Sequence, residues 1–161
     1  MSMSQSQAPD GAMRGLAWAL GAAGLLPFFG NALFAWVAPV HELDGLLRSQ
    51  AHYAGAILAF LGALHWGVVI GARRPFTPRD GGRLVWSVLP ALLAWVVTLY
   101  PPKIALPVLF FALPVVLFAD FLLYRDTPVP GWFLWLRSLL TVAATGCVGA
   151  SWLAMGSRVL P

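Results

Sequence analysis

Long apolar segments alternate with short polar ones along the chain. Five runs are almost continuously apolar, and none of them contains more than one acidic, lysine or arginine residue. A helix rises about 1.5 Å per residue, so about 20 residues cross the ~30 Å hydrocarbon core of a bilayer. We therefore predict five spans, of which the third is slightly short, at residues 15–38, 51–72, 84–100, 104–124 and 132–155.

The pattern within the runs predicts helices. Strands of a membrane barrel alternate apolar and polar residues, whereas these runs are apolar on every side. Proline and glycine are concentrated between the runs, where helices end. The predicted fold class is all-α, a polytopic transmembrane helix bundle. It forms a single domain over residues 15–158, preceded by a disordered polar tail at 1–14.

Composition favours a bilayer over water as the solvent. Hydrophobic residues make up 60% of the chain and charged residues 10%, and the mean hydropathy is +0.79. A soluble domain carries about 25% charged residues, which this chain does not have. We expect the lipid bilayer to be the main partner. The net charge of +4 does not indicate nucleic acid, because the basic residues lie mainly in short connections.

The basic residues predict the orientation. Cytoplasmic connections of membrane proteins are enriched in Lys and Arg. The strongest cluster, within residues 73–83, should therefore be cytoplasmic, which places the N-terminus in the cytoplasm and the C-terminus outside. Seven basic residues are then inside (Arg14, Arg73, Arg74, Arg79, Arg83, Arg125, Arg137) and three outside (Arg48, Lys103, Arg158).

Three ionisable residues lie within the predicted spans on the same side of the midplane. Asp120 lies about one turn from the inner end of the fourth run, and Arg137 about one turn from the inner end of the fifth. These runs are antiparallel neighbours, so the two side chains should reach the same depth. His65 lies in the inner half of the second run. We predict one polar cluster of the three, either a salt bridge that joins helices or part of a ligand or proton site.

Other chemistry is sparse in the sequence. His41, Glu42 and Asp44 are possible metal ligands, but their spacing matches no recognised site, so we predict a solvated loop or short interfacial helix. Cys147 is the single cysteine and is interpreted as a packing residue. The chain contains no catalytic or nucleotide-binding motif, which favours a non-enzymatic protein without catalytic residues, metal or cofactor.

Small residues recur at four-residue spacing in the second run. Gly67 and Gly71 form a G-x-x-x-G step, and Gly55 and Ala59 form a similar one. Such steps allow helix backbones to approach closely. We therefore predict that both steps are helix-packing surfaces.

Residues 52–67, His-Tyr-Ala-Gly-Ala-Ile-Leu-Ala-Phe-Leu-Gly-Ala-Leu-His-Trp-Gly, resemble the signature of the transmembrane protein 69 family. Asp120, residues 130–132 and residues 136–141 are also similar to that family. The resemblance implies a five-helix inner-membrane protein of a bacterial and mitochondrial group without an assigned activity. It also indicates the positions to consider first for ligand binding: Tyr53, His65, Trp66, Asp120, Trp132 and Arg137.

Three functions are compatible with these observations. The first is a non-catalytic accessory or assembly subunit of a larger, for example respiratory, membrane complex, or a homo-oligomer. The second is an intramembrane binding protein for a quinone, lipid or tetrapyrrole, in which His65, Asp120 and Arg137 form the polar site. The third is a transporter or channel formed by an oligomer. It ranks last, because five helices without repeats and with few polar lining residues make a poor conduit in a monomer. The first is our leading prediction from the sequence.

Overall fold

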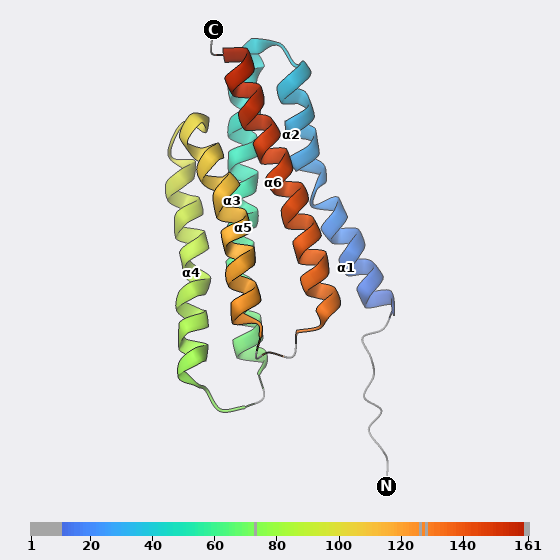
Figure 1. The fold of residues 1–161 in the computed structure, drawn as a ribbon, viewed down its shortest axis with the longest axis vertical. Helices are drawn as coiled ribbons and strands as arrows, with labels where there is room; N and C mark the ends of the chain where they lie inside the picture. Colours follow the sequence, from blue (N-terminus) through green and yellow to red (C-terminus); the bar gives the residue numbers. More distant parts are fainter. Residues whose placement is uncertain (1–10, 73, 126, 128, 160–161) are drawn as a thin grey trace.

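The computed structural model describes residues 11–72, 74–125, 127 and 129–159. This part of the chain is helical, without a strand, and the start of α1 and the end of α6 lie at opposite ends of the bundle (Figure 1). The all-α prediction is confirmed. The helices are α1 (Gly11–Ala23), α2 (Leu26–Val37), α3 (Val40–Gly71), α4 (Pro78–Thr98), α5 (Pro102–Leu123) and α6 (Gly131–Val159).

The first span consists of two helices, α1 and α2. The chain turns at Gly24 and Leu25, whose backbone amides donate to the carbonyl oxygens of Leu20 and Ala22. Pro27 lies in the first turn of α2, where its missing N–H is not required. Together the two helices cover Gly11–Val37. α1 therefore begins within the predicted tail of residues 1–14, of which residues 1–10 lie outside the described part of the chain. α1 buries none of its residues, whereas α2 buries Phe28, Ala32 and Ala35.

α3 is the central helix of the bundle. It packs against α2, α4, α5 and α6. It has 32 residues and begins directly after Pro39, so residues 40–50 are its first turns rather than a separate loop or interfacial helix. At about 1.5 Å per residue it is roughly 48 Å long, longer than the hydrocarbon core.

The third span is longer than predicted because α4 begins before the last arginine of the basic turn. Thr77 and Asp80 form a capping box at its start, in which the Thr77 amide donates to Asp80 Oδ2 at 2.9 Å. α4 therefore has 21 residues and meets the length of a membrane span. The predicted start at residue 84 excluded the first six residues of this helix.

Glycines bring α3 and α4 into close contact. A Cβ atom at Gly62 would lie 2.5 Å from the backbone oxygen of Ser87, and one at Gly55 would lie 3.1 Å from Thr98 Cγ2. The predicted packing role is therefore confirmed for Gly55. Gly67 and Gly71 differ, because no described atom of another helix lies within 4 Å of a Cβ built at either position.

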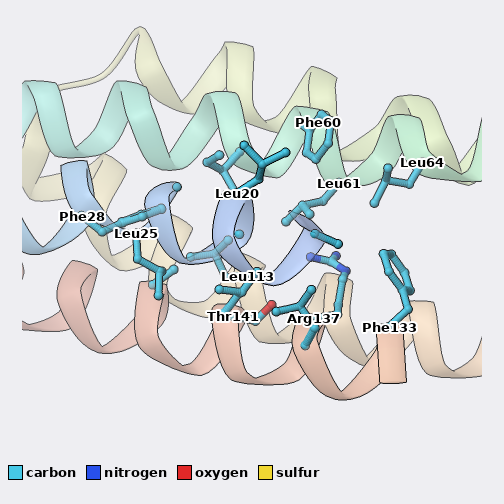
Figure 2. Close-up of a pocket in the computed structure, with 17 residues that line it drawn as sticks. Leu20, Leu25, Phe28, Phe60, Leu61, Leu64, Leu113, Phe133, Arg137 and Thr141 are labelled. Carbon is cyan, nitrogen blue, oxygen red and sulfur yellow. The ribbon is translucent and has the colours of Figure 1, made fainter. Parts of the chain in front are cut away.

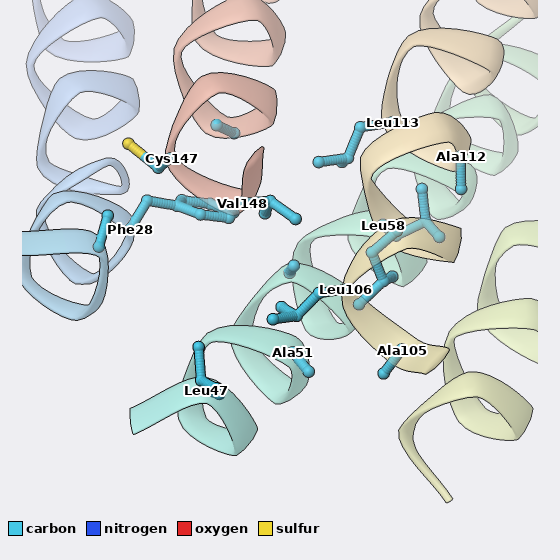
Figure 3. Packing of buried hydrophobic residues seen from close by; sticks show 14 of the residues in the cluster. Phe28, Leu47, Ala51, Leu58, Ala105, Leu106, Ala112, Leu113, Cys147 and Val148 are labelled. Atoms are coloured by element: carbon cyan, nitrogen blue, oxygen red, sulfur yellow. The ribbon is translucent and has the colours of Figure 1, made fainter. Parts of the chain in front are cut away.

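A cluster of apolar side chains fills much of the interior between α2, α3, α5 and α6. Figure 3 shows Leu58 of α3, Leu106 and Leu113 of α5, and Val148 of α6 in this cluster. Cys147 belongs to the same cluster, as predicted for a packing residue. Large apolar side chains also cover the outside of the helices, and five helical segments within the described ranges are long and apolar enough to span a membrane. The protein is a multi-pass membrane protein.

Candidate functional site

Asp120 lies at the centre of a buried polar cluster that joins three helices. Its Oδ1 accepts a hydrogen bond from His65 Nε2 of α3 at 2.9 Å, and its Oδ2 accepts one from Arg137 Nε of α6 at 2.7 Å. Asp120 and His65 are 0% exposed and Arg137 is 5% exposed. The cluster predicted from the depth of these residues is confirmed.

Helix geometry explains why the three side chains meet. α5 and α6 are antiparallel and are joined by a short connection, so residues at similar distances from that connection reach the same depth. α3 packs against both helices and directs His65 toward them. In hydrocarbon an isolated charge is expensive, and the pairing of Asp120 with Arg137 reduces that cost.

The charges of the cluster balance, but its hydrogen-bonding capacity is not exhausted. One carboxylate and one guanidinium sum to zero when His65 is neutral. His65 Nδ1 is buried without a hydrogen-bond partner in the described part of the chain. Arg137 Nη2 is ion-paired with Asp120 Oδ2 at 2.5 Å, but a guanidinium carries five N–H donors, more than one carboxylate oxygen accepts. Donors of Arg137 therefore remain for another acceptor.

Tyr124 completes the environment of His65. The two rings stack with centroids 4.6 Å apart and planes inclined by 19°. Tyr124 is buried and its ring also makes an edge contact with Phe133 at 6.5 Å. The sequence analysis did not select Tyr124. Its spacing was the available signal, because residues four apart in a helix share a face and Tyr124 follows Asp120 by four.

A cavity of about 330 Å³ lies beside the cluster, between α1–α2 on one side and α3 and α6 on the other (Figure 2). Its wall is apolar except for Arg137 and Thr141 of α6. Figure 2 shows the Arg137 guanidinium directed toward Leu61 and Phe133 at one end of this cavity. Further lining residues are Ala17, Leu20, Gly21, Gly24, Leu25, Phe28, Ile57, Phe60, Leu64, Leu113, Leu136, Leu140 and Ala144.

Three of the predicted site residues lie outside the cluster. The Tyr53 hydroxyl donates to the Gly24 backbone oxygen at 2.8 Å, so Tyr53 supports the break between α1 and α2. Trp66 is 45% exposed on the outside of α3. Trp132 packs against Phe133 with ring centroids 6.2 Å apart, and its buried indole nitrogen has no hydrogen-bond partner among the described residues.

A second polar network lies at the start of α4, where the sequence analysis had used arginines only to predict orientation. Arg74 donates to both oxygens of Asp80, at 2.7 and 2.8 Å, and Arg83 Nη1 donates to Asp80 Oδ1 at 3.0 Å. Arg83 Nε and Nη2 also donate to the Leu123 backbone oxygen at the end of α5, at 3.1 and 2.8 Å. The hydrogen bonds with Asp80 raise the pKa of Arg74. This network connects α4 to α5.

The side chains of the segment considered for metal binding contact near neighbours within α3. Arg48 Nε donates to Asp44 Oδ2 at 2.7 Å across one turn of α3, and His41 Nε2 lies 3.8 Å from Glu42 Oε1. Over the described ranges, no group of three or more His, Cys, Asp or Glu residues has the arrangement to hold a metal ion.

The fold and the cluster define a helix-bundle membrane protein whose buried His–Asp–Arg cluster borders an apolar cavity. A family model described as "Protein of unknown function (DUF3429)" matches residues 13–153. The chain belongs to this family.

Two proteins named Transmembrane protein 69 are similar to the chain. The protein from Xenopus tropicalis is 36% identical over 127 residues, which are 78% of this chain and 49% of that protein. The protein from Mus musculus is 31% identical over 124 residues, which are 76% of this chain and 49% of that protein. The chain thus spans about half the length of these relatives, and the resemblance noted in the sequence is confirmed. No solved structure matches the chain.

Proposed function

We propose that this protein binds an amphipathic small molecule within the bilayer and does not catalyse a reaction on it. The ligand would have an apolar body and an anionic or hydrogen-bond-accepting headgroup. The observation that carries this proposal is that Arg137 lines an otherwise apolar cavity while only part of its guanidinium is used by Asp120. An apolar pocket with few convergent polar groups is the usual form of a small-molecule site.

The size of the cavity narrows the class of ligand. Its volume of about 330 Å³ is near the lower end of the ~300–1,000 Å³ that small-molecule pockets occupy. This favours a quinone ring or part of an acyl chain over a tetrapyrrole. Arg137 offers N–H donors, which suit a quinone carbonyl or a fatty-acid carboxylate.

Residues at the edge of the cavity favour entry of a ligand directly from the bilayer. Leu20 of α1 and Phe60 of α3 line the cavity and are both exposed on the outside of the bundle. α1 packs mainly against α6 and has no buried residue. A hydrophobic ligand would therefore enter sideways, between α1 and α3, without crossing an aqueous loop.

Ligand binding can be tested with the protein in nanodiscs, using a short-chain ubiquinone and oleic acid as separate probes. Ala17→Phe places a ring into the cavity from α1 and should lower affinity for the probe that binds by at least ten-fold. Leu16→Phe is the matched control, because Leu16 is exposed and does not line the cavity. The proposal fails if neither probe binds, or if both variants bind like the original protein.

An accessory role in a larger complex is the second candidate. Gly67 and Gly71 are exposed, and a Cβ at either position meets no described atom of another helix within 4 Å. Because small residues at this spacing promote close helix contact in membranes, another chain is a suitable partner for this face. Gly67→Leu should then abolish copurification of a partner at fixed stoichiometry. Native mass spectrometry would show whether that partner is a second copy.

For location, we propose the bacterial inner membrane with the basic segment at residues 73–83 in the cytoplasm. Arg74, Arg79 and Arg83 support this orientation through the positive-inside rule. A cysteine introduced at Gly82 should react with an impermeant maleimide only after cells are opened. Labelling of this cysteine in intact cells would indicate the opposite orientation.

A further inference from the structure

Two polar side chains line the apolar cavity, and both belong to α6. They are Arg137 and Thr141, which are one helical turn apart (Figure 2). Residues four apart in a helix lie on the same face, with Cβ atoms about 5–6 Å apart. Long side chains in a helix lean toward its N-terminal end, so the guanidinium of Arg137 lies farther from Thr141 than this spacing. The cavity therefore has two separate polar points on one wall.

The hydroxyl of Thr141 is available to a ligand. A hydroxyl in a helix can donate to a carbonyl oxygen of the preceding turn, as Ser138 Oγ does to the Leu134 oxygen at 2.8 Å. Thr141 makes no side-chain hydrogen bond of this kind with the described residues, although it is only 4% exposed. Burial of a hydroxyl without a partner costs free energy, which an acceptor within the cavity would recover.

Arg137 also has donors that Asp120 does not use. Its Nε donates to Asp120 Oδ2 at 2.7 Å, and its Nη2 is ion-paired with the same oxygen. The remaining nitrogen, Nη1, carries two N–H groups and makes no hydrogen bond or ion pair with the described residues. One end of the cavity wall thus offers N–H donors and the other offers an O–H donor.

The charge of Arg137, in contrast, is already balanced. Asp120 neutralises it, and both side chains are buried. An anionic headgroup at Arg137 would add a second negative charge beside Asp120 and leave it without a counter-charge while His65 is neutral, which is costly within a bilayer. A neutral headgroup accepts the same hydrogen bonds and keeps the sum of charges at zero. The site therefore favours a neutral acceptor over a carboxylate.

We propose that the cavity binds a neutral ring with carbonyl groups at opposite ends, as in a p-quinone, with one carbonyl on Arg137 and the other on Thr141. The inference rests on the proposed small-molecule function and selects the class of ligand. Standard bond lengths place the two oxygens of such a ring about 5 Å apart, so two hydrogen bonds of about 3 Å let it bridge donors about 8–11 Å apart. A carboxylate, with oxygens about 2 Å apart, suits donors that lie closer together, such as two nitrogens of one guanidinium.

Equilibrium binding of decylubiquinone and of oleate to the protein in nanodiscs tests this proposal, with partition into empty nanodiscs subtracted. We expect decylubiquinone to bind at least ten-fold more tightly than oleate. Thr141→Val removes the hydroxyl at nearly constant shape and should lower the affinity for decylubiquinone about five-fold, which corresponds to about 1 kcal/mol for one neutral hydrogen bond. Thr141→Ser keeps the hydroxyl and should retain the affinity.

Thr145→Val is the matched control. Thr145 lies one turn farther along α6, does not line the cavity, and has a buried hydroxyl that likewise lacks a partner among the described residues. This variant should bind decylubiquinone like the original protein. The inference is overturned, while the proposed function stands, if oleate binds as tightly as decylubiquinone or if Thr141→Val weakens decylubiquinone no more than Thr145→Val does. If neither probe binds, the inference and the proposed function are both overturned.

Discussion

Arg137 and Asp120 lie side by side on antiparallel helices, with Nε of the arginine 2.7 Å from Oδ2 of the aspartate. Both side chains are buried, so each is the counter-charge that the other requires. His65 shares the same carboxylate through its other oxygen, at 2.9 Å. Asp120 thus connects α3, α5 and α6 through a single side chain.

The first prediction tests the energetic coupling between the two charges of this ion pair. Asp120→Asn leaves Arg137 charged without a counter-charge and should lower the free energy of unfolding by about 3–5 kcal/mol. The double variant Asp120→Leu/Arg137→Met removes both charges and should lose less than half as much. Thermal unfolding in detergent measures both changes. Equal losses in the single and double variants would show that the charges are not energetically coupled.

The second prediction concerns the contact between α3 and α4. Gly62→Ala places a methyl group against the Ser87 backbone oxygen, 2.5 Å away, so the helices must separate. We expect a loss of about 1–3 kcal/mol in thermal or denaturant unfolding, which is typical of overpacking. Gly67→Ala is the control on the same helix, because its Cβ meets open space and alanine favours helix. A stable Gly62→Ala protein would contradict the close approach of these backbones.

The third prediction concerns the break in the first span. Tyr53→Phe removes the hydrogen bond to the Gly24 backbone oxygen, and this should cost about 1 kcal/mol. Amide exchange in α1 should become faster, while exchange in α5 stays the same. Tyr100→Phe serves as the control because Tyr100 is exposed. Unchanged exchange in α1 would show that Tyr53 does not hold the break.

The fourth prediction compares two arginines at the same end of the bundle. Arg158 donates hydrogen bonds to the backbone oxygens of Ala35 and Ala38 at 2.6 and 2.5 Å. It thereby supplies donors to carbonyl groups that lack a partner within the last turn of α2. Arg158→Ala should cost about 1.5–3 kcal/mol, the range for a hydrogen bond from a charged donor. Arg48→Ala breaks only an exposed pair with Asp44 and should cost about 0.3–0.5 kcal/mol. Thermal unfolding of both variants checks this prediction. Arg158→Ala should lower the unfolding midpoint several times as much as Arg48→Ala, and equal shifts would contradict it.

The core of the polar cluster could be predicted from the sequence because hydrocarbon restricts charged residues so strongly. Asp120 and Arg137 had the same depth on neighbouring helices, which left few arrangements that pair them. The positions of Tyr53 and Trp66 along the chain did not reveal that their side chains point away from the polar cluster. The direction of a side chain depends on the orientation of α3 about its own axis relative to the neighbouring helices. Gly62 and Gly67 show the same limit: both are small residues on α3, and only one faces α4.

Two features had local signals that the hydropathy pattern overlooked. The sequence Thr77-Pro-Arg-Asp80 has the spacing of a capping box and the proline expected at a helix start, which would have placed the beginning of α4 correctly. Pro27 indicated the interruption between α1 and α2. Arginines in the basic turn were interpreted through topology alone, so the pairing of Asp80 with Arg74 and Arg83 was not anticipated.

The three-way sharing of Asp120 has a consequence for biosynthesis. Ribosomes deliver α3 first and α5 later, and α6 emerges last with the arginine that neutralises the carboxylate. Until then the Asp120 carboxylate would lack its counter-charge near one end of α5, at a cost below the about 2.5–3.5 kcal/mol of a charge at mid-bilayer. The final two helices should consequently leave the insertion machinery as one hairpin.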